Sequence, residues 1–150
     1  MMRGYDFIWR LARPLLPLML AWRARSGKED AARLTERFGR YDHRDNLPDD
    51  PLWIHAVSVG ETVAGIALAE AIRKTGETAP ILMTTNTVTA AARVAALPAS
   101  LGVTHLYQPL DHPDMVAAFL HRIRPRIALF LESDFWPTLI TATAASGVPV

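Results

Sequence analysis

The sequence is 150 residues long, half of its residues are hydrophobic, and its formal net charge at pH 7 is +1. Such a length suits one globular domain that buries roughly two-thirds of the surface its unfolded chain exposes. The absence of cysteine excludes a disulfide framework, a thiolate zinc site and a cysteine nucleophile. The five histidines show no HExxH-like spacing, so we expect no metal site.

The charge is unevenly distributed along the chain. Residues 1–40 contain nine Arg or Lys against four Asp or Glu, which is a charge of +5 and leaves −4 for the remainder. A basic amino-terminal segment beside a mildly acidic domain favours an anionic neighbour, either a membrane or a nucleic acid.

Residues 1–25, which we call the arm, favour the membrane. The longest stretch without charge, 14–22, is far shorter than the ~20 residues of a spanning helix, and arginines interrupt any signal peptide. Pro14 and Pro17 predict a kink or two short helices. The alternative is that the arm packs on protein that this chain lacks; base-stacking residues do not alternate with the arginines, which disfavours nucleic acid. On a helix, five apolar side chains share one face beside arginines, as in helices that lie among lipid headgroups: Phe7, Leu11, Leu15, Leu18 and Trp22.

The segment after the arm reads as a helix and a linker. Ser26-Gly-Lys-Glu29 matches a capping box and predicts a helix that Gly39 ends. Residues 41–51 are polar and contain two prolines. We therefore divide the chain into a basic arm with its helix (1–40), a linker (41–51) and a domain (52–150).

Strand and helix patterns alternate from residue 52 onward. Helices between apolar strands imply right-handed crossovers and a Rossmann-like parallel sheet, an α/β fold with helices on both faces. The strand at 126–131 looks the most buried, and a chain that ends inside its last strand indicates a fragment of a longer protein. The helix at 61–74 should face the sheet through Val63, Ile66, Ala67, Ala71 and Ile72. The predicted strands are 53–57, 80–84, 104–107, 126–131 and 148–150, and the predicted helices are 61–74, 87–97, 113–122 and 135–146.

Three loops, 58–61, 84–87 and 132–134, leave strand ends on the same side of this sheet. In a doubly wound order 3-2-1-4-5 the first and fourth strands are neighbours, about 4.8 Å apart. Glu61 and Glu132 should then face one crevice. Glu61 could act as a general base that takes the proton of an attacking hydroxyl; the alternative is a first-turn glutamate that interacts favourably with the helix dipole.

Polar groups follow the second strand as well. Thr84, Thr85, Asn86 and Thr87 supply hydroxyl and amide groups at a helix start, which is more than one N-cap requires. They could bind sugar hydroxyls or a carboxylate, although ordinary capping by one of them is the simpler interpretation.

Three further polar residues have structural interpretations. Asp111 and Asp134 are expected to cap the helices that follow them. His55 lies in the middle of a strand and is interpreted as a satisfied core histidine.

Four segments resemble, in order and spacing, the amino-terminal half of the Kdo transferases: His55-Ala-Val-Ser-Val-Gly-Glu61, Thr84-Thr-Asn-Thr-Val-Thr89, Tyr107-Gln-Pro-Leu-Asp111 and Glu132-Ser-Asp-Phe-Trp-Pro137. The basic arm and the stretch Glu36-Arg-Phe-Gly39 also look like that family. Its members move 3-deoxy-D-manno-octulosonic acid (Kdo) from CMP-Kdo onto a lipid A precursor in lipopolysaccharide biosynthesis. The resemblance implies an inverting, metal-independent glycosyltransferase of the two-Rossmann GT-B architecture on the cytoplasmic face of the inner membrane.

The resemblance also implies partners and site residues. The amino-terminal half receives the lipid acceptor, and a carboxyl-terminal domain absent from this chain holds CMP-Kdo, so the chain alone should be inactive. No cofactor is implied, and the partners are the two substrates and an anionic membrane surface. Glu61 is the implied general base, and the implied substrate-binding residues are Ser58, Gly60, Thr84, Thr85, Thr87 and Glu132.

The chain departs from the family pattern at three positions. Asn86 stands in a motif that is often all threonine, Asp134 replaces a frequent glutamate, and Thr138 replaces a frequent asparagine. These departures bear on acceptor preference. Three alternatives stay open: a GT-B enzyme for another lipid-linked acceptor, a non-catalytic membrane-binding domain, and a glycoside hydrolase, because such hydrolases use carboxylate pairs.

Overall fold

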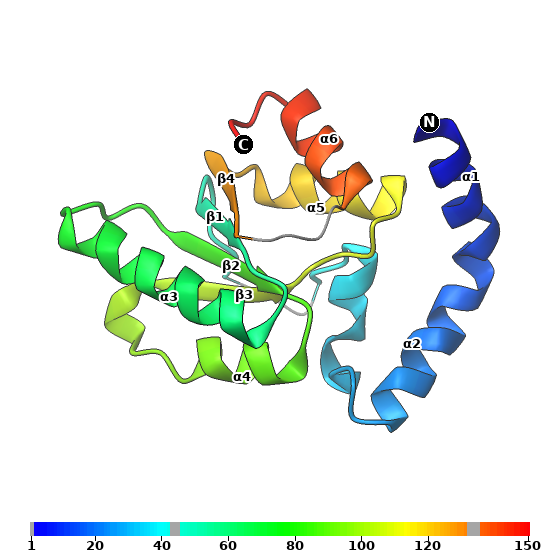
Figure 1. Ribbon diagram of the computed structural model, residues 1–150, viewed down its shortest axis with the longest axis horizontal. Coiled ribbons are helices and arrows are strands. Elements are labelled where there is room, and N and C mark those ends of the chain that lie inside the picture. Colours follow the sequence, from blue (N-terminus) through cyan, green and yellow to red (C-terminus); the bar gives the residue numbers. More distant parts are fainter. Residues whose placement is uncertain (1, 43–45, 132–135) are drawn as a thin grey trace.

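The computed structural model describes residues 2–42, 46–131 and 136–150. Within these residues four strands form one parallel sheet in the order β3-β2-β1-β4 (Figure 1). The α/β class, the parallel sheet and the pairing of the first strand with the fourth are confirmed. The strands are β1 (Leu52–His55), β2 (Ile81–Thr85), β3 (Val103–Tyr107) and β4 (Ile127–Phe130).

The fifth predicted strand is wrong, because residues 148–150 form no strand. Their one backbone link to the sheet is a hydrogen bond from the amide of Ala128 to the carbonyl of Pro149, at 2.9 Å. Proline has no N–H with which to continue a ladder. The segment therefore lies beside β4 without extending the sheet.

Helices cover both faces of the sheet, as predicted. On one face, Phe119 and Leu139 pack with Trp53 and Leu82, while on the other Ala69 packs with sheet residues such as Ile54. Figure 1 accordingly shows α5 and α6 on the opposite side of the strands from α3 and α4. The bounds are α3 (Val59–Lys74), α4 (Val88–Ala95), α5 (Pro113–Ile123) and α6 (Pro137–Ala145).

The most buried strand is β2, not β4. Every residue of β2 is buried, whereas three of the four residues of β4 are partly exposed. β4 is the more apolar of the two in sequence, since β2 contains two threonines, but β2 has a neighbouring strand on each side and β4 lies at the end of the strand order. Position in the sheet, rather than composition, decides the burial.

The predicted inward face of α3 is also wrong in part. Thr62, Gly65 and Ala69 are its buried residues, whereas Val63 is half exposed and Ala67 is exposed. A Cβ on Gly65 would lie 3.3 Å from side-chain atoms of both Ile54 and Met83. The helix therefore approaches the sheet closely along small side chains, which an analysis of large apolar residues misses.

The arm consists of α1 (Met2–Ala12), the 3-10 turn η1 (Arg13–Leu15) and α2 (Leu16–Arg25), so two short helices meet around the prolines as predicted. One side packs on the body: Leu16 and Leu20 are buried, and Arg13 pairs with Asp114 at 3.1 Å. Across the described ranges, no helix has both the length and the apolarity to span a bilayer. The other side bears the apolar stripe, whose members are each 62–71% exposed: Phe7, Leu11, Leu15, Leu18 and Trp22.

The next helix, the 3-10 segment η2 (Ala31–Phe38), begins later than predicted. Its N-cap is Asp30, which accepts a hydrogen bond from the amide of Ala32, whereas Ser26 ends α2 and donates to the carbonyl of Trp22. The capping-box prediction at Ser26 is therefore wrong. Its other half is confirmed, because Gly39 ends η2 with φ of 70°.

Candidate functional site

Three turns follow the carboxyl ends of β1, β2 and β3 at one edge of the sheet. We call these turns the rim: residues 56–58, 86–87 and 108–112. The register places His55 beside Thr84, and Thr85 beside Tyr107, so the turns that follow them leave the same edge. Ligands of parallel α/β folds bind at this edge. Glu132, predicted to join the site, lies outside the described residues, as do Ser133 and Asp134.

Glu61 lies at the start of α3 and forms a capping box with Ser58. The Ser58 hydroxyl accepts the amide of Glu61 at 3.2 Å, and Glu61 Oε2 accepts the amides of Val57 (2.8 Å) and Ser58 (3.0 Å). The partly exposed carboxylate has a second oxygen, Oε1, which accepts no hydrogen bond from the described chain. Capping and proton acceptance are therefore compatible, since each uses a different oxygen.

Ser58 and Gly60 are exposed beside this carboxylate. A Cβ on Gly60 would come no closer than 3.9 Å to its nearest neighbour, the Ser58 hydroxyl. The glycine therefore leaves the approach to the turn open without being required by packing. Substrate binding by these two residues stays a prediction.

The two threonines that end β2 already have partners. Thr84 is fully buried, accepts the indole N–H of Trp53 at 2.8 Å, and lies 2.7 Å from Nδ1 of His55. His55 is itself fully buried, as expected for a core histidine. Thr85 is also fully buried, with its hydroxyl 2.9 Å from Nε2 of His105.

The third threonine of the predicted site caps a helix, as the simpler interpretation expected. Thr87 accepts the amide of Ala90 at the start of α4. Substrate binding by Thr84, Thr85 and Thr87 stays a prediction, and for the first two it requires side chains that now lie in the interior to become accessible.

A buried guanidinium that sequence reasoning did not assign to the site holds the turn after β2. Arg37, from η2, donates from Nη1 to the side-chain oxygen of Asn86 and from Nη2 to its backbone carbonyl, both at 2.6 Å. It also donates to the carbonyl of Gln108 at 3.0 Å and pairs with Glu29 at 2.9 Å. Burial lowers the pKa of Arg37, and the neighbouring Glu29 opposes that shift.

A second buried ion pair anchors the same helix to β3. Glu36 is fully buried, accepts two 2.8 Å hydrogen bonds from Arg33, and accepts the amide of Tyr107 at 2.8 Å. Both arginines lie over the Tyr107 ring, at 4.5 Å for Arg33 and 5.0 Å for Arg37. Burial raises the pKa of the Tyr107 phenol. The sequence singles out the stretch 36–39 only through its resemblance to the family, and it does not indicate that these charges are buried.

Asp111 does not cap α5 as predicted. His112 does so, because its Nδ1 accepts the amide of Asp114. The buried Asp111 carboxylate instead accepts the amides of Thr138 (3.1 Å) and Leu139 (2.7 Å) at the start of α6. A carboxylate at a helix start fits the helix dipole wherever it lies in the sequence.

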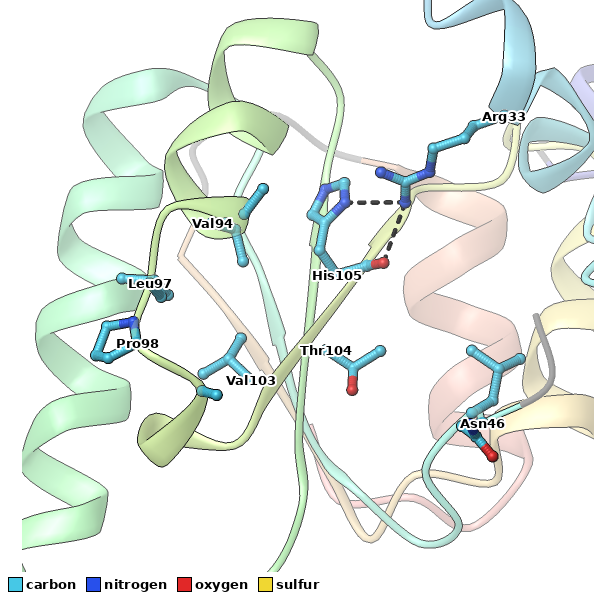
Figure 2. A pocket seen from close by; sticks show the side chains of 11 residues that line it. Arg33, Asn46, Val94, Leu97, Pro98, Val103, Thr104 and His105 are labelled. Atoms are coloured by element: carbon cyan, nitrogen blue, oxygen red, sulfur yellow. Dashed lines mark hydrogen bonds between the residues drawn. The ribbon is translucent and has the colours of Figure 1, made fainter. Parts of the chain in front are cut away.

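A cavity of about 540 Å³ lies along the outer strand β3 and the end of α4. Figure 2 shows Arg33 at one side of it, donating to the ring and to the carbonyl of His105, with apolar residues such as Val94 and Leu97 opposite. None of the predicted site residues that the structure describes lines it. The cavity is therefore separate from the Glu61 turn.

No group of three or more potential metal-ligating side chains occurs in the described portion of the chain. What the rim does offer is chemistry of other kinds. It has one carboxylate oxygen, Glu61 Oε1, that accepts no hydrogen bond from the described residues, and exposed hydroxyl and backbone groups lie beside it. Buried charges hold the neighbouring turns. Such an arrangement can accept a proton from a bound alcohol.

Comparison with known proteins identifies the family. Residues 32–150 match the family model for 3-deoxy-D-manno-octulosonic-acid transferase (kdotransferase). The chain is 37% identical to a 3-deoxy-D-manno-octulosonic acid transferase of Bordetella pertussis over 92% of this chain and 34% of that protein. It is 34% identical to a probable mitochondrial 3-deoxy-D-manno-octulosonic acid transferase of Arabidopsis thaliana, over 96% of this chain and 33% of that protein.

A third relative, the 3-deoxy-D-manno-octulosonic acid transferase of Haemophilus influenzae, is 29% identical over 97% of this chain and 34% of its own length. The chain thus spans about a third of the length of the curated relatives that it matches. The family match takes in η2 from its second residue, the whole sheet and the Glu61 turn. On this evidence the chain belongs to the 3-deoxy-D-manno-octulosonic acid transferase family.

Proposed function

We propose that this chain is the acceptor-binding half of an inverting GT-B glycosyltransferase that transfers Kdo from CMP-Kdo to a lipid A precursor, with Glu61 as general base. The observation that carries the proposal is that the two oxygens of the Glu61 carboxylate have different surroundings. Oε2 is bound by the backbone of its own turn, and Oε1 has no donor among the described residues. Membership of the Kdo transferase family supplies the reaction class.

In the proposed reaction, a hydroxyl of the acceptor attacks the anomeric carbon of Kdo from the face opposite CMP. The bond from that carbon to the acceptor oxygen forms as the bond to the CMP oxygen breaks, and the hydroxyl proton passes to Glu61 Oε1. CMP is a stable leaving group that needs no strong acid. One carboxylate base and no metal are therefore sufficient, and the donor would be held by a carboxyl-terminal domain.

The arm supports contact with an anionic membrane surface, which the proposed reaction would place at the cytoplasmic face of the inner membrane. Its exposed stripe combines aromatic and aliphatic side chains, and Arg10 and Arg25 are exposed on the same helices. Apolar residues beside cationic ones are suited to a peripheral helix among anionic headgroups. An acceptor that is itself a membrane lipid would then be within reach of the protein without leaving the bilayer.

The test replaces Glu61 in the full-length protein that carries this chain. In Glu61→Gln the amide oxygen can still accept the backbone of residues 57 and 58, but the NH₂ group cannot take a proton. We expect CMP release with a lipid A precursor to fall by at least about 100-fold, which is the usual contribution of a general base. The matched control is Glu70→Gln, an exposed glutamate of the same helix, which should leave the rate unchanged.

Unchanged thermal unfolding of Glu61→Gln would separate loss of the base from loss of the fold. Near-normal transfer by that variant would refute the assignment of Glu61. CMP release with another lipid-linked acceptor but not with a lipid A precursor would leave the assignment of the base unchanged and would refute the assignment of the acceptor.

A further inference from the structure

A continuous chain of charged and polar groups joins the arm to the turn after β2. Arg23, in α2, donates to Glu29 Oε1 at 3.0 Å, and Glu29 Oε2 accepts Arg37 Nε at 3.0 Å. Arg37 then donates to both oxygens of Asn86 at 2.6 Å. Glu29 and Arg37 are both buried, so the hydrogen bond between them is shielded from solvent, whereas the Arg23 side chain is 37% exposed.

A second, independent link joins the arm to the start of α6. The hydroxyl of Tyr5, in α1, donates to Asp111 Oδ2 at 2.7 Å. The same carboxylate accepts the backbone amides of Thr138 and Leu139. Asp111 thus lies between the first helix of the arm and the first turn of the last helix.

Both links end on backbone groups: the first on carbonyls of two rim turns, and the second on amides in the first turn of α6. Arg37 binds the carbonyls of Asn86 and Gln108, and Asp111 binds two amides of α6. Bonds to backbone atoms fix the path of a turn whatever side chains it bears. Neither Arg37 nor Asp111 is bonded to Glu61, so any effect on its chemistry must act through the placement of the turns.

We propose that Arg37 and Asp111 are positioning residues through which docking of the arm holds the rim in its acceptor-binding shape. This inference rests on the proposed function in so far as the rim receives the acceptor. The arm then has two separable surfaces. Its stripe contacts lipid, and its inner side, through Arg23 and Tyr5, orders the turns that surround the base.

Hydrogen exchange with mass spectrometry on the full-length protein tests the link without an assay of transfer. Arg23→Gln should speed amide exchange in residues 84–90, and Tyr5→Phe should speed exchange at the start of α6, each by roughly three- to tenfold, which corresponds to the net contribution of one typical hydrogen bond. The matched control is Leu18→Ser, an exposed stripe residue of the same arm. It should change neither segment.

A kinetic experiment uses an acceptor without acyl chains, so that attachment of the protein to a membrane does not affect the measured rate. Arg23→Gln and Tyr5→Phe should lower kcat/KM by about three- to tenfold, and Lys28→Gln, which removes an exposed charge from the segment after α2, should not. Since neither residue touches the proposed base, the pH dependence of the remaining activity should match that of the unmodified protein.

Unchanged exchange in both segments of the Arg23→Gln and Tyr5→Phe variants would overturn the inference, and so would equal effects from Leu18→Ser. The exchange experiment also separates this inference from the proposed function. If the protein transfers no Kdo but its variants show the predicted exchange pattern, the link between the arm and the rim is supported and the proposed function is refuted.

Discussion

Asp111 accepts a 2.7 Å hydrogen bond from the amide of Leu139, so a carboxylate in the turn after β3 caps a helix that follows β4. The aspartate is fully buried, and the loss of water around it raises the pKa of its carboxyl group. Because the protonated form is favoured in the folded protein, ionisation of Asp111 opposes folding relative to the unfolded chain.

This relationship predicts a pH dependence of stability. A carboxyl group whose pKa is raised on folding contributes stability below its unfolded value of about 3.9 and loses that contribution as the pH rises through the folded value. We expect the free energy of unfolding of the unmodified protein, relative to Asp111→Asn, to fall as the pH rises from 4. Urea denaturation of both proteins between pH 4 and 8 measures the difference, and a difference that rises with pH would contradict the prediction.

The buried arginine of η2 predicts a large effect on stability. Arg37→Met leaves the Glu29 carboxylate and the Asn86 oxygens without their principal donor in the interior. Breaking a buried pair from one side costs about 3–5 kcal/mol, and we expect urea denaturation to show a loss of about 3 kcal/mol.

The neighbouring Arg40 provides the control for this variant. Arg40 is exposed, and its side chain makes no hydrogen bond or ion pair with the described residues. Arg40→Met should change the free energy of unfolding by less than about 0.5 kcal/mol, as is usual for surface positions. Equal effects of the two variants would show that the buried network contributes no more than the surface does.

Two glycines with nearly the same backbone geometry separate strain from contact. Gly39 (φ 70°) and Gly27 (φ 68°) both adopt left-handed conformations, but a Cβ on Gly39 would lie 2.6 Å from the carbonyl oxygen of Met115, and one on Gly27 would meet nothing within 4 Å. Gly27→Ala should cost about 1–2 kcal/mol for the conformation alone. Gly39→Ala should cost distinctly more, because the end of η2 must move away from α5.

Thermal unfolding of the two alanine variants, measured in parallel, checks this prediction. A Gly39→Ala protein that is no less stable than Gly27→Ala would mean that α5 moves away from the added methyl group without a loss of stability.

The exposed stripe predicts binding to anionic vesicles. Leu18 is 70% exposed and unneeded for packing, so Leu18→Ser should leave thermal stability unchanged and weaken partitioning into vesicles that contain phosphatidylglycerol by roughly tenfold. Flotation with the full-length protein measures the partitioning. The matched control is Val63→Ser, which alters an exposed apolar residue of α3 away from the arm.

Equal partitioning of the Leu18→Ser variant and the unmodified protein would contradict the prediction that the stripe binds lipid. Loss of binding in both serine variants would instead indicate a response to general surface hydrophobicity.

Most of the fold could be predicted from local patterns in the sequence. Apolar runs predicted β1 to β4 within a few residues, and the short SVGE turn correctly placed Glu61 at the first turn of a helix. These features depend on neighbours in the chain, which a sequence displays directly. The order of the sheet followed because right-handed crossovers leave few topologies open.

Several of the errors share a cause, which is that the residue's partners are distant in sequence. Asp111 has a helix immediately after it and caps another one, because the fold brings the start of α6 to its carboxylate. Gly65 marks the buried face of α3 only once the side chains of two strands lie against it. Glu36 and Arg37 look like surface charges until β3 and the arm enclose them. Such roles depend on tertiary contacts that no window along the chain contains.

The two oxygens of Glu61 have a consequence for selectivity. A carboxylate tethered through one oxygen to two amides of its own turn cannot swivel, so its open lone pairs point along a fixed line. A sugar offers several alcohols of similar acidity. If Glu61 is the base, as we propose, the position of the bound sugar selects the alcohol that reacts, and the relative acidity of the alcohols does not.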